Sequence, residues 1–195
     1  MVSSVPRAGN TVTRALARGV LSIAGWRIEG EVPDEPKLVL VGAPHTTNFD
    51  FVLTKLTAGA LGVRLFWVGK QSLFPAWLAP LARRLGGIPV DRTSTAGFVE
   101  AMVAEFQRRD QFYLALMPAG SRATPDRWRS GFYYIARDAG VPMFLVGFDR
   151  ARRTMRLGPM LNARPDAAYE DDVARIRMHF DGMTRKRTGA ACGRA

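Results

Sequence analysis

A histidine and an aspartate stand five positions apart in the segment APHTTNFDF, residues 43–51. His45 follows the apolar run LVLVG at 38–42, which predicts a short buried strand, whereas Asp50 opens a stretch with apolar residues at helical spacing. The two side chains are therefore expected to come from different backbone elements and to meet at one point. That arrangement suits general-base chemistry by His45, with Asp50 accepting the other ring N–H of the imidazole.

A structural interpretation explains the same pair without chemistry. An aspartate in the first turn of a helix is favoured by the helix dipole, and Thr47 could cap that turn. A single histidine is also more often a structural residue than a catalytic one. Spacing alone leaves both interpretations open.

Two further segments carry groups that suit the binding of an anion. Arg92 in VDRTS and Arg122 in MPAGSRA could grip a phosphate with charge-assisted hydrogen bonds. Gly120 would let backbone N–H groups converge on the same anion. Taken singly, such arginines are usually solvated surface charges.

The elements that must position these residues alternate between strand and helix. Strands are predicted at 26–30, 38–42, 64–70, 87–91, 112–118 and 142–149, with an edge strand at 154–160. Helices are predicted at 48–62, 74–86, 95–109, 130–140 and 166–181. This alternation predicts an α/β fold, a single-domain sandwich with a largely parallel central sheet flanked by helices. The candidate residues follow strands, and ligands bind at the carboxyl ends of strands in such sheets.

The length of 195 residues predicts one domain, with an amphipathic helix in residues 1–25, the α/β domain in 26–183 and a disordered basic tail in 184–195. No apolar run is long enough to span a bilayer, and arginines interrupt the N-terminal region, so a cleavable signal peptide is not expected. Cys192 is the lone cysteine, which excludes an internal disulfide and fits a reducing compartment. Two histidines and one cysteine also argue against a structural zinc site.

The N-terminal helix is predicted to carry an apolar stripe, Val12, Leu16, Val20 and Ile23, opposite Arg14 and Arg18. Such a helix is typical of an interfacial membrane anchor. It is equally typical of a surface helix packed on its own domain. The pattern leaves the two interpretations even.

The net charge of +11 indicates an anionic partner, namely nucleic acid, a phosphorylated metabolite or an anionic lipid surface. An excess of arginine also arises from a GC-rich genome, which requires no partner. Nucleic acid is not expected, because the sequence has no recognisable binding module and no interleaving of aromatic with basic residues.

Four segments in order resemble the lysophosphatidic acid and glycerol-3-phosphate acyltransferases. The family's blocks are H-x4-D, G-x-x-x-x-R, P-E-G-T-R-S and V-P-x-x-x-V. The matching segments here are residues 45–50, GIPVDR at 87–92, MPAGSR at 117–122 and GVPMFLV at 140–146. WVGKQSLF at 67–74 is similar to the family's lysine-bearing segment, and the resemblance spans residues 37–148.

The resemblance implies an O-acyltransferase that moves a fatty acyl group from acyl-CoA or acyl carrier protein to a hydroxyl of a lipid precursor. It implies no cofactor besides the thioester donor. His45 would deprotonate the acceptor hydroxyl and Asp50 would orient the histidine. The alkoxide would attack the thioester directly, without an acyl-enzyme intermediate. A cytoplasmic protein attached peripherally to the inner face of the cell membrane is expected, through residues 10–25 and the basic tail, because basic residues are attracted to an anionic surface.

The family's remaining site residues map onto two sides of a cleft. On the acceptor side, the head group or phosphate would be held by Lys70, Arg92, Gly120, Ser121 and Arg122. On the acyl side, Val141 and Pro142 would shape the cleft. An apolar groove for the chain would draw on Phe49, Phe51, Leu73, Phe74 and Trp77, each of which is equally a candidate for the core.

The third block departs from the family pattern at two positions. Ala119 replaces its glutamate and Ser121 its threonine. The second change keeps a hydroxyl, but the first removes a carboxylate. A catalytically impaired lipid-binding homologue is therefore the alternative function.

Overall fold

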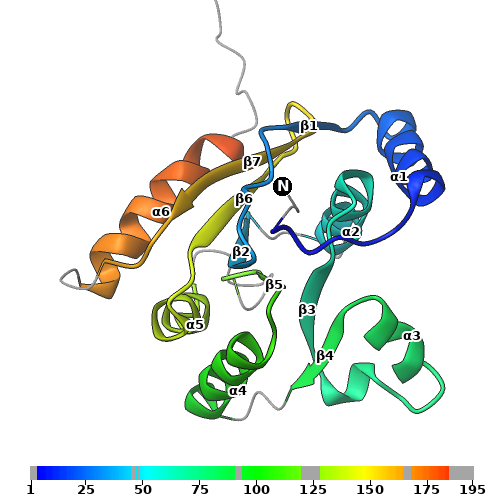
Figure 1. Cartoon of the computed structure of the whole chain (residues 1–195). Coiled ribbons are helices and arrows are strands. Elements are labelled where there is room, and N and C mark those ends of the chain that lie inside the picture. Colours follow the sequence, from blue (N-terminus) through cyan, green and yellow to red (C-terminus); the bar gives the residue numbers. More distant parts are fainter. Residues whose placement is uncertain are drawn as a thin grey trace, which may run out of the picture.

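A seven-stranded sheet runs through the centre of the computed structural model, which describes residues 4–44, 47, 49–90, 94–119, 128–164 and 168–184 (Figure 1). The spatial order of the strands is β1-β7-β6-β2-β5-β3-β4. Their bounds are Arg27–Glu29 (β1), Lys37–Ala43 (β2), Leu65–Lys70 (β3), Gly87–Val90 (β4), Phe112–Leu116 (β5), Met143–Asp149 (β6) and Thr154–Leu161 (β7). Strands β2 to β6 are mutually parallel, and β7 runs antiparallel to β6. The predicted α/β fold with a largely parallel sheet is confirmed.

The middle strands are apolar apart from Lys37 at the start of β2 and Asp149 at the end of β6, because helices cover both faces of the sheet. In β2, Val39 and Val41 belong to one hydrophobic cluster, while Leu38 belongs to the cluster on the opposite face. All three side chains are fully buried. The alternation places a core on each side of β2.

Six α-helices of the described chain pack around this sheet (Figure 1). They are α1 (Thr11–Ile23), α2 (Phe49–Leu61), α3 (Ala79–Arg84), α4 (Thr95–Arg108), α5 (Gly131–Ala139) and α6 (Tyr169–Thr184), with a short 3-10 turn, η1, at Gln71–Leu73. Helices α4, α5 and α6 cover one face, and α2 covers the other with α1 packed against it. The small helix α3 lies beside β4 at the edge of the sheet.

The helical periodicity of the sequence identifies the buried faces of two helices. Met102 and Phe106 of α4 are buried against the sheet, as are Ile176 and Phe180 of α6. Helix α5 ends at Gly140, whose left-handed backbone (φ 65°) suits glycine because it has no Cβ.

Two expected elements differ from the structure. The helix expected at 74–86 is shorter, since α3 begins only at Ala79 with Pro80 in its first turn. Proline has no N–H to donate, so it suits that position but not a helix interior. The strand expected at the edge, β7, lies between β1 and β6, because the three-residue β1 pairs with its outer side.

Helix α1 turns its apolar stripe outward. Its exposed large apolar side chains are Val12, Leu16, Val20 and Ile23, with Ile23 91% exposed. The opposite side contacts α2, where Arg18 Nε donates to the carbonyl of Ala60 (3.1 Å) and Ala17 lies beside Gly59. Helix α1 therefore packs on its own domain, but through the side opposite the apolar stripe, which faces outward. None of the helices in the described part has the length and apolarity needed to cross a membrane.

Candidate active site

The carboxyl ends of the five parallel strands lie along one edge of the sheet, because parallel strands point the same way. The strand order places the continuation of β6 beside that of β2, and the continuations of β5, β3 and β4 come next. Neighbouring strands are about 4.8 Å apart. Groups just beyond the ends of β6, β2 and β5 are therefore within side-chain reach of one another.

Asp50 lies at this edge, in the first turn of α2, and its side chain is fully buried. Its Oδ2 accepts a hydrogen bond from the backbone N–H of Thr47 (2.9 Å). The backbone N–H of Asp50 donates to the carbonyl of Thr47 (3.2 Å). Two hydrogen bonds, one donated by each residue, therefore join Thr47 and Asp50 in the turn that enters α2. Asp50 thus supplies the cap through its carboxylate, whereas Thr47 was expected to supply it through its hydroxyl.

Arg150 is the residue that the sequence analysis missed. It is the first residue after β6, and its Nη2 donates to Oδ1 of Asp50 and to the hydroxyl of Thr47 (2.9 Å). The strand at 142–149 was predicted from the sequence, and the rule that ligands bind at the carboxyl ends of strands could have drawn attention to the arginine after it. That rule had been applied only to the ends of three other strands.

Several predicted site residues lie outside the described residues. They are His45, Arg92, Gly120, Ser121 and Arg122. The nearest described positions before them are Pro44 after β2, Val90 at the end of β4 and Ala119 after β5, all at the carboxyl edge. Lys70 is described, and it ends β3 at the same edge with an exposed side chain.

Ala119 occupies a closed position after β5. It is 5% exposed and forms an antiparallel bridge with Trp128, and Arg129 N–H donates to the carbonyl of Pro118 (2.9 Å). Nearby, Met117 lies so close to Gly42 of β2 that a Cβ on that glycine would clash with its sulfur. The continuation of β5 is therefore packed directly against the end of the strand that leads to Asp50.

Val141 and Pro142 are not brought to this edge. They precede β6, and Pro142 accepts a hydrogen bond through its carbonyl from Val39, near the start of β2 (2.9 Å). The length of β6 separates them from Asp50 by roughly 20 Å. The prediction that they shape the cleft beside the catalytic pair is not supported, because in a parallel sheet residues before a strand lie at the edge opposite to residues after it.

The predicted apolar groove residues divide into packed and exposed ones. Phe74 is buried and stacks on Trp67 at 5.6 Å, and Phe51 meets the same ring edge-on at 4.9 Å. Phe49 and Trp77 are exposed, the latter to 81%. The side chain of Leu73 lies outside the described part. Phe51, Trp67 and Phe74 thus form an aromatic cluster between α2 and β3.

His179, on α6, belongs to a different region. It packs edge-on against Phe180 (5.2 Å), and burial lowers its pKa although a backbone hydrogen bond involving Gly158 opposes the shift. These contacts are those of a packed structural residue. No group of three or more potential metal ligands occurs among the described histidine, cysteine, aspartate and glutamate side chains.

The described geometry can orient and polarise a base. A buried carboxylate with two fixed donors keeps one position, and a carboxylate has enough lone pairs to accept an imidazole N–H as well. The sequence places His45 two residues before Thr47, whose backbone N–H donates to Asp50 and whose hydroxyl accepts from Arg150.

Comparisons with known proteins identify the family and the fold. The family model described as Acyltransferase matches residues 26–148. The chain therefore belongs to the acyltransferase family. Its fold is similar to that of the crystal structure of the 1-acyl-sn-glycerophosphate (LPA) acyltransferase PlsC from Thermotoga maritima, with a TM-score of 0.59 and 12% identity, over 86% of this chain and 75% of that one. The search of curated proteins gave no match.

Proposed function

We propose that this acyltransferase moves a fatty acyl group from an acyl thioester, acyl-CoA or acyl-carrier protein, to a hydroxyl of a lipid precursor. The observation that carries the proposal is the fully buried Asp50 at the carboxyl edge of the sheet, five residues after the histidine of the H-x4-D motif. Buried ionisable side chains held by specific partners are frequent at functional sites, so a buried, hydrogen-bonded acid five residues after a histidine in the sequence favours chemistry.

In this mechanism His45 removes the proton from the acceptor hydroxyl, and the oxygen forms a bond to the thioester carbonyl carbon. The carbon–sulfur bond then breaks, the thiolate leaves, and the proton held by His45 neutralises it. Asp50 accepts the other ring N–H, which selects the tautomer and stabilises the imidazolium. General-base catalysis of this kind contributes about 10²–10⁴-fold to the rate.

The acceptor side of the site is assigned to basic and small residues of three motifs. Arg92 and Arg122 are proposed to hold the acceptor's phosphate or head group together with Gly120 and Ser121, and exposed Lys70 ends a strand at the same edge. Guanidinium groups suit this task because they form paired, charge-assisted hydrogen bonds with phosphate oxygens.

The identity of the acceptor is proposed to depend on Ala119. In the family pattern a glutamate at this position can hold the phosphate-binding arginine and accept from a hydroxyl, whereas a methyl group does neither. We therefore expect an acceptor other than simple glycerol phosphate, such as a larger or less polar lipid hydroxyl. Burial of Ala119 is consistent with a smaller residue at a closed position.

Helix α1 is proposed to attach the enzyme to the anionic inner face of the cell membrane. The outward apolar stripe of α1 suits insertion among lipids, and the net charge of +11 suits an anionic surface. Attachment would bring the site to lipid acceptors and to acyl chains, for which each buried methylene contributes about 0.8 kcal/mol. A second copy of the chain is the other possible occupant of the stripe, and a size measurement in solution distinguishes the two.

The test is a thioester-release assay with acyl-CoA and acyl-carrier protein against a panel of acceptors. The panel holds glycerol 3-phosphate, its 1-acyl form and amphipathic alcohols without phosphate. Release that depends on acceptor, with an ester product, supports the proposal. The loss of the family's glutamate at Ala119 favours the second candidate, an impaired lipid-binding homologue, which would bind acyl lipids without accelerating release above the uncatalysed rate.

A further inference from the structure

Two pairs formed by an arginine and a buried aspartate flank the carboxyl end of β6. Arg152 pairs with Asp149, the last residue of the same strand (3.0 Å), which is local in sequence. Arg150 instead pairs with Asp50, one hundred residues away on α2. One pair closes a turn, whereas the other joins two elements at the proposed active site.

A single nitrogen of Arg150 makes both contacts with the segment that enters α2. Its Nη2 donates to Oδ1 of Asp50 and to the hydroxyl of Thr47 (2.9 Å). The other carboxylate oxygen, Oδ2, accepts from the backbone N–H of Thr47 (2.9 Å). Arg150, Thr47 and Asp50 therefore form a closed set of contacts around one carboxylate.

The contacts of Arg150 with the described residues do not satisfy its whole guanidinium group. Its Nε is buried and has no hydrogen-bond partner among the described residues. Buried donors without a partner lose hydrogen bonds to water, so each one calls for an explanation. The arrangement favours the position of Asp50 over full satisfaction of the guanidinium.

We infer that Arg150 is a positioning residue for the catalytic pair. It acts through Asp50, because its hydrogen bonds hold the Asp50 carboxylate and the turn at Thr47 in one orientation. The ring N–H of His45, two residues before Thr47 in the sequence, would then donate to a carboxylate of fixed orientation. This inference rests on the proposed function. It assigns no contact between Arg150 and the substrates, so its loss should lower kcat while leaving both KM values nearly unchanged.

The test is a double-mutant cycle in the acceptor-dependent release assay. Arg150→Met should lower kcat by roughly 10–100-fold, because small misplacements at a reacting centre have effects of this size. On the Asp50→Asn background the same change should lower kcat by less than about twofold, since coupled residues are not additive. Arg150→Lys should recover most of kcat, because both bonds come from one nitrogen and an ammonium group can replace it.

Arg152→Met is the matched control. Arg152 lies two residues after Arg150, and its substitution also removes an ion pair to a buried aspartate, Asp149. Its kcat should stay within about twofold of wild type. If Arg150→Met does not fold, Arg150→Gln carries the same expectation. Unchanged kcat in Arg150→Met or Arg150→Gln would overturn the inference while the proposed function stands. A loss of kcat on the Asp50→Asn background equal to that on the wild-type background would do the same. A wild type without acceptor-dependent release overturns the proposed function itself, and the inference with it.

Discussion

Asp50 carries an acidic side chain in the protein interior, where a charged group is unfavourable unless it has partners. Its side chain is fully buried, and transfer of an isolated carboxylate from water to a protein interior is strongly unfavourable. The N–H of Thr47 and the guanidinium of Arg150 compensate for this cost. The structural interpretation of Asp50, a helix-capping acid, is therefore part of the account, because the same bonds that cap the helix also fix the carboxylate.

Ala119 gives a prediction at the scale of one side chain. Ala119→Glu should shift preference from an amphipathic alcohol toward glycerol 3-phosphate or its 1-acyl form, because it restores the carboxylate of the third motif, three residues before Arg122 in the sequence. It should also lower the Tm, since the position is 5% exposed. The release assay and a thermal melt measure the two effects.

Ala119→Gln is the control for the charge, because it has nearly the same size. If it shifts preference as far as the glutamate does, volume and not charge sets the acceptor. A wild type that already prefers the glycerol phosphates, and keeps that preference with glutamate, would show that this position does not select the acceptor.

The sequence was informative about single residues where local spacing decides their place. Asp50 was assigned to a first helical turn after a strand, and it lies there. Arg150 was missed because its partner lies one hundred residues away, and no spacing rule contains that pairing. Val141 and Pro142 were placed by resemblance alone, and the direction of β6 puts them at the opposite edge of the sheet.

At the scale of elements, α1 shows the limit of an amphipathic pattern. The stripe was predicted correctly, but periodicity does not say which side of a helix packs inward. Here small residues and arginine stems meet α2, with Ala17 beside Gly59 and Arg18 bonded to Ala60. Arginine can cover apolar surface with its methylene groups, so a basic side can pack on a neighbour.

The outward stripe predicts that α1 binds anionic vesicles. The double variant Leu16→Glu, Ile23→Glu should bind such vesicles at least tenfold more weakly in a sedimentation assay. The reason is that burial of each apolar side chain in the lipid contributes about 1.5–3 kcal/mol. The Tm should be unchanged, since these side chains are 64% and 91% exposed. Binding by the wild type should also weaken with added salt.

Met178→Glu on α6 is the matched control, because this side chain is also exposed, to 67%. It should leave vesicle binding unchanged. Equal binding by the α1 double variant and the wild type would place the membrane contact elsewhere.

Helix α6 is joined to the rest of the fold by a buried polar cluster. Asp172 accepts from the Tyr133 hydroxyl (3.1 Å) and from the backbone N–H (3.0 Å) and Nε (2.7 Å) of Arg164. Burial raises the pKa of Asp172, but these hydrogen bonds outweigh it and hold the pKa below its ordinary value of 3.8. The unfolded chain therefore binds more protons than the folded one as the pH falls through this range.

The cluster predicts how stability depends on pH. The contribution of Asp172 is fully present above its unfolded pKa and is lost as the pH falls below about 4 through the lower folded pKa. Asp172→Ala should cost about 1–3 kcal/mol at pH 7, because it leaves the buried hydroxyl of Tyr133 without its acceptor. Urea unfolding from pH 2 to 7 should show a flatter acid limb in the variant. Asp171→Ala, at an exposed position of the same turn, should change stability by less than about 1 kcal/mol.

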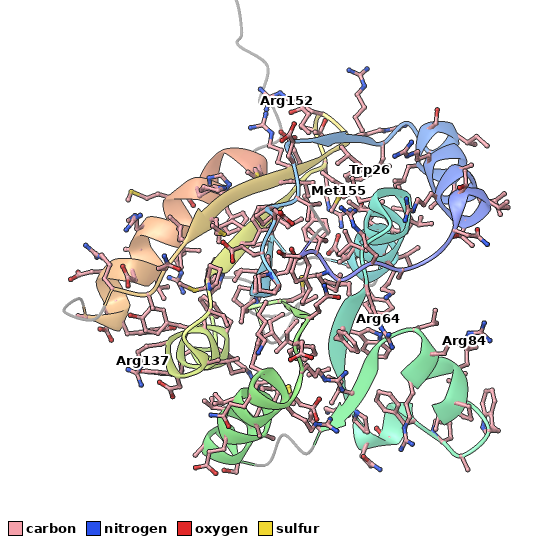
Figure 2. The ribbon with its side chains drawn as sticks, in the orientation of Figure 1. Trp26, Arg64, Arg84, Arg137, Arg152 and Met155 are labelled. Carbon is pink, nitrogen blue, oxygen red and sulfur yellow. The ribbon has the colours of Figure 1, made fainter. Side chains whose placement is uncertain are left out.

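At the scale of the whole molecule, the labelled arginines are not gathered on one side. Arg84 on α3, Arg137 on α5 and Arg152 after β6 project from three different sides in Figure 2. These three charges are spread over the surface, and a net charge of +11 favours the approach of anionic donors and lipid surfaces. The sign of the net charge was readable from composition, but its distribution depends on the fold.

The overall architecture was predictable because strands and helices alternate and the buried strands are apolar throughout. The order of the strands was not, since it depends on pairings between distant segments such as β2 with β5 and β6. That order places the continuations of β6, β2 and β5 side by side and thereby creates the proposed site.

The most direct test of the account is turnover of an acyl thioester by wild type and His45→Ala with the acceptor that the panel selects. We predict acceptor-dependent release by the wild type and a loss of about 10²–10⁴-fold in the variant, because the general base is removed. The Tm should remain near that of the wild type, which excludes unfolding as the cause. Full turnover by a folded His45→Ala protein would contradict general-base catalysis by His45 and with it the proposed mechanism.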